Sequence, residues 1–243
     1  MDQLDESLAG CDVGKVFQRV LGGAFVQQIT SKGGELMSQT EQEFTTLTLG
    51  VKDYANLEES LASSIKGDLL EGPNAYYCEK IKSKVDAIKR TCVNRLPKML
   101  MIHLQRFEYD WSVETRFKLN DHFEFPIDLD MRPYTVAGLA EAAGKDLSED
   151  SKHKLYPPSY YQYKLVGVLV HSGTAEAGHY YSYAKQRGGE DDSFYIFDDT
   201  RVEQYDLEAR PARTPPFVVG CASACAAPTL NAAGQPRATL SLR

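Results

Sequence analysis

A histidine and, one strand later, a pair of aspartates are the residues of this chain whose types and spacing could do chemistry. His179 lies in the run GHYYSYAKQR, and Asp198 and Asp199 close the run FYIFDD. In a nucleophilic triad an imidazole takes the proton of a Cys or Ser, while a carboxylate on its other ring nitrogen fixes the tautomer and stabilises the imidazolium. The segment therefore holds residues suited to be the base and the orienting acid of a triad.

The glycines between the two runs predict how these side chains meet. An antiparallel hairpin that turns between Gly188 and Gly189 sets His179 opposite Asp198. Directly opposed residues have Cβ atoms roughly 4.5–5.5 Å apart, which permits a hydrogen bond between imidazole and carboxylate. A structural interpretation stays open, in which His179 is a satisfied strand residue and the aspartates open a turn through Asx hydrogen bonds.

The region that must position this pair, residues 96–217, has the pattern of an antiparallel meander. Its runs of apolar, β-branched and aromatic residues are separated by Gly, Asp and Asn turns. These runs are PKMLMIHLQRF, YKLVGVLVHS, HYYSYAKQ and SFYIFDD.

Residues 1–95 combine short strand signals with one helix. Asn56 and Glu59 form a capping-box-like start, and apolar residues then recur every fourth position, at Leu57, Leu61, Ile65 and Leu69. Residues 218–243, in contrast, are rich in Ala, Pro and Ser without a core pattern, so we expect a disordered tail that holds Cys221 and Cys225 as free thiols.

Five motifs in order resemble the ubiquitin-specific protease family of cysteine-type deubiquitinases. They are LPKMLMIHLQRFEYDW, FKLNDHFEFP, YKLVGVLVHSG, AGHYYSYAKQR and FYIFDDTRV. DMRPYTVAGLA and KGDLLEGPNAYYCEK are similar to the large fat-facets-type members. The resemblance implies an α+β, papain-like cysteine protease fold. Residues 1–95 would then supply the fingers and helical part, and residues 96–217 the antiparallel palm sheet.

The resemblance also implies roles for individual residues. His179 is expected to be the general base, Asp198 its orienting acid, and Asp199 a supporting carboxylate. The loop HSGTAEAG and the segment 110–116 resemble two blocking loops beside the cleft for the ubiquitin tail, which ends in two glycines. The expected cleft residues are His171, Ser172, Gly173, Gly178, Tyr180 and Tyr181. Glycine allows close approach of a substrate backbone, although tyrosines that alternate on a strand also serve as core filling.

The family's nucleophilic box, Asn-x-x-x-x-Cys at the start of a helix, has no counterpart in the sequence. Cys11 lacks the upstream Asn, and Cys92 falls at an apolar-spaced position that favours burial. We therefore expect the thumb segment that bears the nucleophile to be absent and the isolated chain to be inactive. The parent protein would hydrolyse ubiquitin isopeptide bonds. The alternative is a non-catalytic ubiquitin-binding module or an inactive truncated fragment.

The sequence predicts neither a metal nor another cofactor. A zinc ribbon needs two Cys-x-x-Cys pairs, whereas the first pair's place reads QQITSKGGEL and the second retains only Cys78, with Ile81 in place of the other thiol. The five histidines show no ligand spacing.

Composition predicts an intracellular chain, and the family resemblance implies ubiquitin and ubiquitinated proteins as its partners. The 243 residues can bury a sizeable core. Five irregularly spaced cysteines favour a reducing compartment. The start MDQLDESLAG lacks a signal-peptide profile, and no apolar run is long enough to span a membrane. We expect the cytosol or nucleus, no membrane association and, from the net charge of −7, no nucleic-acid partner.

Overall fold

The computed structural model describes residues 12–32, 35–79, 81–144, 156–186, 193–205, 221–225, 229–230 and 236–237. These fall into two compact units that are discontinuous in sequence, unlike the consecutive regions expected from the sequence. The first unit comprises residues 1–45, 61–97 and 131–156, and the second comprises 46–60, 98–130 and 157–243. Within the described residues, no helix has both the length and the apolar character needed to cross a membrane.

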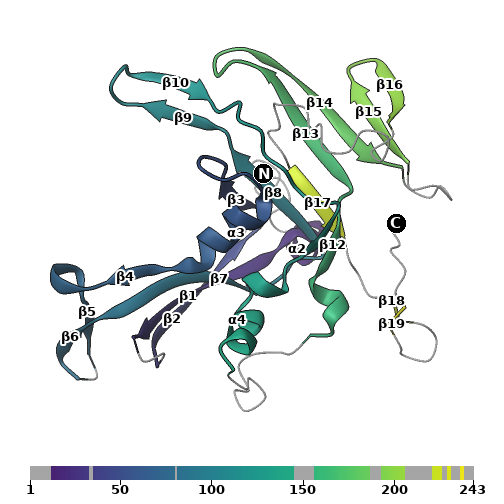
Figure 1. The fold of residues 1–243 in the computed structure, drawn as a ribbon. Coiled ribbons are helices and arrows are strands. Elements are labelled where there is room, and N and C mark those ends of the chain that lie inside the picture. Colours follow the sequence, from purple (N-terminus) through teal and green to yellow (C-terminus); the bar gives the residue numbers. More distant parts are fainter. Residues whose placement is uncertain are drawn as a thin grey trace. The chain divides into compact units, whose positions relative to one another are not determined.

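The first unit is built on a four-stranded antiparallel sheet with strand order β2-β1-β7-β4 (Figure 1). Its strands are β1 (Gly23–Ser31), β2 (Leu36–Phe44), β4 (Asp68–Leu70) and β7 (Ala87–Arg95). A short hairpin joins β5 (Tyr76–Cys78) to β6 (Ser83–Val85). The other elements are α2 (Asp12–Leu21), η1 (Gly72–Asn74), η2 (Arg132–Tyr134) and α4 (Val136–Ala142).

The core of the first unit forms where α4 meets the sheet. Val26 on β1 and Cys92 on β7 are cross-strand partners, and both are buried together with Val136. Ile65 and Leu139 pack against this cluster. Cys92 is therefore a small core residue, as its apolar spacing predicted.

Helix α3 (Leu57–Lys66) begins at the predicted capping box. The Glu59 backbone N–H donates to Asn56 Oδ1 at 2.8 Å, and the Glu59 carboxylate accepts from the Ala55 backbone N–H at 2.9 Å. The helix ends before Gly67, whose φ of +81° suits glycine. The fourth residue of the predicted repeat, Leu69, consequently lies in β4 and is half exposed.

The second unit holds the predicted meander. Strands β13 (Gly167–Gly173), β14 (Gly178–Lys185), β15 (Phe194–Asp198) and β16 (Arg201–Tyr205) follow one another as antiparallel neighbours (Figure 1). Two further antiparallel pairs are β9 (Phe107–Asp110) with β10 (Thr115–Lys118), and β11 (Asp128–Asp130) with β12 (Gln162–Lys164). The short helix η3 (Pro158–Tyr161) precedes β12.

Part of the Ala-rich tail differs from the expected disorder. Strand β17 (Cys221–Cys225) pairs antiparallel with β8 (Met99–Gln105), whose other edge pairs in parallel with β3 (Leu47–Gly50). The short strands β18 (Thr229–Leu230) and β19 (Pro236–Arg237) pair with each other. An open edge of β8 offers backbone hydrogen bonds that a strand can satisfy whatever its side chains, so composition alone did not reveal this pairing. The rest of the predicted tail lies outside the described residues.

A buried arginine anchors the start of the β9–β10 hairpin. Arg106 is 1% exposed, and its Nη1 donates to the backbone oxygens of Leu119 and Asp121 at 3.2 and 2.8 Å. Its guanidinium lies over the Phe123 ring, 6.0 Å from the centroid. Burial lowers the Arg106 pKa. These contacts tie the chain that leaves β10 to the chain that enters β9.

We expect Arg106→Leu to lower the free energy of unfolding by about 2–4 kcal/mol, because a buried and a part-buried carbonyl hydrogen bond lose their charged donor. Chemical denaturation of the variant measures this change. Arg19→Leu, at an exposed site near the end of α2, is the control and should stay within about 0.5 kcal/mol of the parent. Equal stability of the two variants would contradict an anchoring role for Arg106.

Candidate active site

The hydrogen bond predicted between His179 and Asp198 is present in the structure. His179 Nε2 lies 2.5 Å from Asp198 Oδ1. Both side chains are partly open to solvent, at 48% and 35% exposure. Because Nε2 faces the carboxylate, Nδ1 is the ring nitrogen that could accept a proton from a nucleophile. The arrangement is that of a base with its orienting acid, and the catalytic roles themselves stay a prediction.

The hairpin register that produces this contact differs from the predicted one. Ser182 pairs with Phe197, and Gln186 N donates to Ser193 O, so His179 and Asp198 are diagonal neighbours rather than directly opposed. A register difference of two residues keeps both side chains on the same face of the sheet, since side chains alternate with period two. The turn itself, residues 187–192, lies outside the described residues.

The two aspartates raise the proton affinity of the imidazole. The hydrogen bond to Asp198 is the largest cause that raises the His179 pKa above 6.5, and the charges of Asp198 and Asp199 add to it. Asp199 begins the turn after β15 with φ of +50°, and its carboxylate, that of Asp198 and the imidazole come within 4.8 Å of one another. Asp199 is thus close enough for the supporting role that the resemblance implied.

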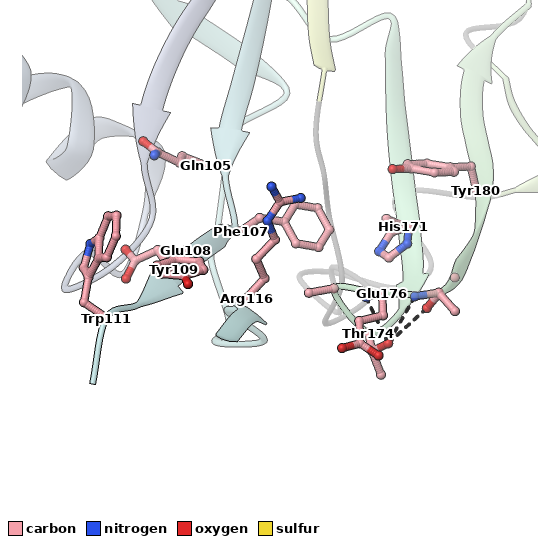
Figure 2. A pocket seen from close by; sticks show the side chains of 13 residues that line it. Gln105, Phe107, Glu108, Tyr109, Trp111, Arg116, His171, Thr174, Glu176 and Tyr180 are labelled. Carbon is pink, nitrogen blue, oxygen red and sulfur yellow. Dashed lines mark hydrogen bonds between the residues drawn. The ribbon is translucent and has the colours of Figure 1, made fainter. Parts of the chain in front are cut away.

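A groove of about 850 Å³ lies between the β9–β10 hairpin and the β13–β14 hairpin (Figure 2). Side chains of the segment from the end of β8 through β10 line one side, and those of β13, β14 and their connecting loop line the other. The lining residues are Gln105, Phe107, Glu108, Tyr109, Trp111, Arg116, His171, Thr174, Ala175, Glu176, Ala177, Gly178 and Tyr180. Both segments that resemble blocking loops therefore contribute to one groove.

The expected cleft residues do not all line the groove. His171, Gly178 and Tyr180 line the groove, whereas Ser172, Gly173 and Tyr181 do not. His171 pairs with Tyr180, while Ser172 pairs with His179. Neighbouring residues on a strand point to opposite faces, so Tyr180 belongs to the groove face and Tyr181 to the face of His179.

His171 is a buried aromatic wall of the groove. Its side chain packs edge-on against Phe107 at 5.4 Å and lies tilted against Tyr180 at 4.7 Å between ring centroids. The residue is 4% exposed, and its buried Nδ1 has no hydrogen-bond partner among the described residues. Burial, followed by the nearby Lys118 cation, lowers the His171 pKa below 6.5. The lowered pKa favours the neutral form of the ring.

The loop between β13 and β14 is ordered by its own hydrogen bonds. Gly173 has φ of +123°, and the Thr174 backbone N–H donates to Ala177 O at 2.8 Å. Thr174 Oγ1 accepts from the backbone N–H groups of Glu176 and Ala177 at 3.4 and 3.3 Å (Figure 2). Gly173 therefore shapes the groove through the backbone, although its own atoms do not line it.

Lys118 at the end of β10 attaches this loop to the opposite hairpin. Its Nζ donates to His171 O at 2.7 Å and to Gly173 O at 3.4 Å. Burial, followed by the charge of Arg106, lowers the Lys118 pKa. The ammonium thus joins the β9–β10 hairpin to the end of β13.

Sequence reasoning missed most of the aromatic wall on the β9–β10 hairpin. Phe107 and Tyr109 precede the segment 110–116 that was expected to form a blocking loop, and both line the groove. Trp111 is 84% exposed, with its ring edge-on to Tyr109 at 4.6 Å. The alternation of aromatics in FEYDW was the available signal, because residues two apart on a strand share a face.

The described cysteine side chains are not suited to act as the nucleophile. Cys78 and Cys92 are both buried and free, and burial raises the Cys92 pKa to about 11, which disfavours the reactive thiolate. Cys11 lies outside the described residues, as do the side chains of Cys221 and Cys225.

The described residues around Cys78 do not fit a zinc ribbon. Cys78 pairs with Ser83 across the β5–β6 hairpin, and Ile81 is 59% exposed. A tetrahedral ribbon site requires four N or S ligands, and Cys78 is the one thiol that this hairpin supplies.

Comparison with known proteins supplies a family context for this geometry. The family model described as ubiquitin carboxyl-terminal hydrolase matches residues 2–223. The chain is 44% identical over 218 residues to ubiquitin carboxyl-terminal hydrolase 9X of Mus musculus, an alignment that covers 86% of the chain and 8% of that protein. It is 38% identical over 208 residues to the probable ubiquitin carboxyl-terminal hydrolase FAF of Drosophila melanogaster, an alignment that covers 84% of the chain and 7% of that protein. The chain thus spans a small part of these relatives.

Solved structures resemble the fold as well. A chain from the SAGA Ubp8/Sgf11/Sus1/Sgf73 DUB module bound to ubiquitin aldehyde superposes with a TM-score of 0.68 at 27% identity, covering 86% of this chain and 42% of that one. A second structure of the SAGA DUB module, bound to monoubiquitin, gives a TM-score of 0.65 at 26% identity, covering 86% and 42%. The mixed α+β architecture is therefore that of the catalytic domains of this family.

Gly178→Ala tests how closely the loop packs on His171. A Cβ at Gly178 would lie 2.1 Å from His171 Nε2 and 2.5 Å from the Ser172 backbone oxygen, so we expect the ring to be displaced and the free energy of unfolding to fall by about 1–3 kcal/mol. Chemical denaturation and the NMR resonances of His171 report the two effects. Gly50→Ala is the control, because its Cβ meets no atom closer than 4.0 Å. An unshifted His171 ring in Gly178→Ala would show that the contact is not tight.

Asp198→Asn tests the electrostatic link to the imidazole. Removal of the carboxylate charge should return the His179 pKa to near its ordinary 6.5, as an NMR titration of the ring can show. A raised folded-state pKa contributes stability that is fully present below the unfolded pKa and lost as pH rises through the folded pKa. The parent should therefore lose this contribution as pH rises from about 6.5 through the folded-state pKa, whereas Asp198→Asn should not. A His179 pKa that stays elevated in the variant would show that Asp198 is not the cause.

Proposed function

The chain belongs to the ubiquitin carboxyl-terminal hydrolase family, and on that premise we propose that it supplies the base, the orienting acid and the substrate groove of a cysteine-type deubiquitinase. The observation that carries the proposal is the hydrogen bond between His179 and Asp198. His179 lies on β14, the strand that also lines the groove through Gly178 and Tyr180. The reaction is thiol-dependent hydrolysis of ubiquitin isopeptide bonds. We place it in the cytosol or nucleus.

In this mechanism His179 Nδ1 takes the proton of a cysteine thiol while Asp198 holds Nε2. The thiolate attacks the carbonyl carbon of the isopeptide bond, and the imidazolium gives its proton to the departing lysine amine. Water then attacks the resulting thioester, with His179 again as the base, and releases the ubiquitin carboxylate and the thiol. Asp198 favours each imidazolium state through its charge, which is an effect that raises the His179 pKa.

We propose that the nucleophilic thiol comes from outside the described residues. Cys92 has a pKa of about 11 and, like Cys78, is buried, so neither is suited to attack a carbonyl. The curated relatives are far longer than this chain, which covers 8% of 9X. A parent protein of that length would have ample sequence from which the thiol could come.

The groove suits an extended glycine-ended tail. Gly178 brings the loop backbone against His171, and Tyr180 and Tyr109 offer aromatic surfaces on opposite walls. A segment without side chains can lie between such walls, whereas a larger side chain would meet the rings. We propose that the ubiquitin tail binds here, and the DUB modules whose structures contain ubiquitin support this assignment. The net charge of −7 suits a ligand with a basic face.

A second candidate function is ubiquitin binding without chemistry. The burial of Cys78 and Cys92 favours this function for the chain by itself, because the described side chains form the groove but include no reactive thiol. The His179–Asp198 pair favours the catalytic proposal, because a binding module has no chemical need for an imidazole oriented by a carboxylate.

We expect the purified chain to bind ubiquitin and to form no covalent adduct with ubiquitin that carries a C-terminal electrophile. Calorimetric titration measures the first, and intact-mass spectrometry the second. Ubiquitin without its two terminal glycines should bind about tenfold or more weakly, because the tail contacts in the groove are lost. Tyr180→Ala should weaken the binding of intact ubiquitin while leaving that of the shortened form unchanged.

Two outcomes would count against the proposal. Equal affinity for intact and shortened ubiquitin would show that the groove does not hold the tail. An adduct on Cys11, Cys78 or Cys92 would show that the chain supplies its own nucleophile.

A further inference from the structure

Three tyrosines lie on the face of the β13–β16 sheet that carries His179. Tyr181 and Tyr183 follow His179 at alternate positions on β14, and their rings meet edge-on at 5.8 Å between centroids. Tyr183 in turn meets Tyr205 of β16 at 4.6 Å. The row extends from the edge strand β16, across β15, to the strand of the imidazole.

The register places Tyr181 beside the orienting carboxylate. Ser182 and Phe197 are paired, so one step toward the open end of the hairpin brings Tyr181 next to Asp198. Residues two apart on a strand share a face, and paired residues share a face across strands. Tyr181, His179 and Asp198 therefore project from the same side of the sheet, whereas Tyr180 projects into the groove on the other side.

The Tyr181 side chain is restrained by its surroundings. Burial is the main cause that raises its pKa, a hydrogen bond with Tyr183 acts in the opposite direction, and the Asp198 charge raises the pKa further. The Tyr181 ring also packs edge-on against the Tyr183 ring. A half-buried ring with such contacts is suited to limit the rotamers of the carboxylate beside it.

Arg201, a cation near Asp198, forms its ion pair with Glu203. Arg201 pairs with Asp198 across the β15–β16 turn, but its guanidinium binds Glu203 through two hydrogen bonds of 2.8 and 2.6 Å. The charged groups that act on His179 are then Asp198 and Asp199. Asp198 is consequently directed to the imidazole rather than to the arginine.

We propose that Tyr181 is a positioning residue whose ring holds the Asp198 carboxylate against His179 Nε2. Loss of the ring would admit water and free the carboxylate to rotate, which weakens the hydrogen bond to the imidazole. The consequence for catalysis depends on the proposed function, but the effect on the imidazole does not. It can be measured on this chain without substrate, so its failure is distinct from failure of the ubiquitin test.

The experiment is an NMR titration of the His179 ring in Tyr181→Ala and Tyr181→Phe. We expect Tyr181→Ala to lower the His179 pKa toward 6.5, removing about half or more of its elevation, and Tyr181→Phe to keep the parent value. Asp198→Asn marks the value without the carboxylate. If Tyr181→Ala does not fold, Tyr181→Val replaces it, because a β-branched residue suits a strand.

Tyr195→Ala is the matched control. Tyr195 lies on β15 at a position whose side chain projects from the opposite face of the same sheet, so the same chemical change should leave the His179 pKa unaltered. An unchanged His179 pKa in folded Tyr181→Ala or Tyr181→Val would overturn the proposal. An equal decrease of the His179 pKa in Tyr195→Ala would also overturn it, because it would indicate a general loosening of the sheet. An equal decrease in Tyr181→Phe would overturn it as well, because the effect would then come from the hydroxyl and not from the ring.

Discussion

The antiparallel register of β13, β14 and β15 is the constraint on which the candidate site depends. Because strand side chains alternate, β14 sends His179 to one face and Tyr180 to the other. The first face joins the imidazole to Asp198, and the second joins Tyr180 to His171 in the groove. A slip of one residue would exchange these faces and separate the acid from the base. One strand pairing thus supports both the proposed chemistry and the recognition surface.

Much of this arrangement could be predicted from the sequence, because it depends on local pattern. Alternating apolar runs around glycines indicated the meander, and Asn56 with Glu59 indicated the start of α3. The contact between His179 and Asp198 followed from the same hairpin reasoning, even though the register differs by two residues. That difference left the prediction intact because a shift of two preserves the face, whereas the length of the turn has no clear signature in the sequence.

Features that depend on contacts distant in sequence could not be predicted from it. The two compact units each draw on separated stretches of chain, because β3 pairs with β8 in one unit and α4 packs against β7 in the other. The burial of Arg106 and the contacts of Lys118 with loop carbonyls likewise require the folded neighbours. Tyr181 lies apart from the groove for a simpler reason, since strand alternation alone separates it from Tyr180.

The self-bonded loop at Thr174 has a kinetic consequence. Its backbone is already closed by hydrogen bonds within the loop and by Lys118 at its base, so the conformational entropy of this wall is lost during folding rather than at encounter with a ligand. Association with such a wall requires no slow closure step. For the proposed ligand tail, the rate of complex formation would then be set by diffusion and by the orientation of the tail.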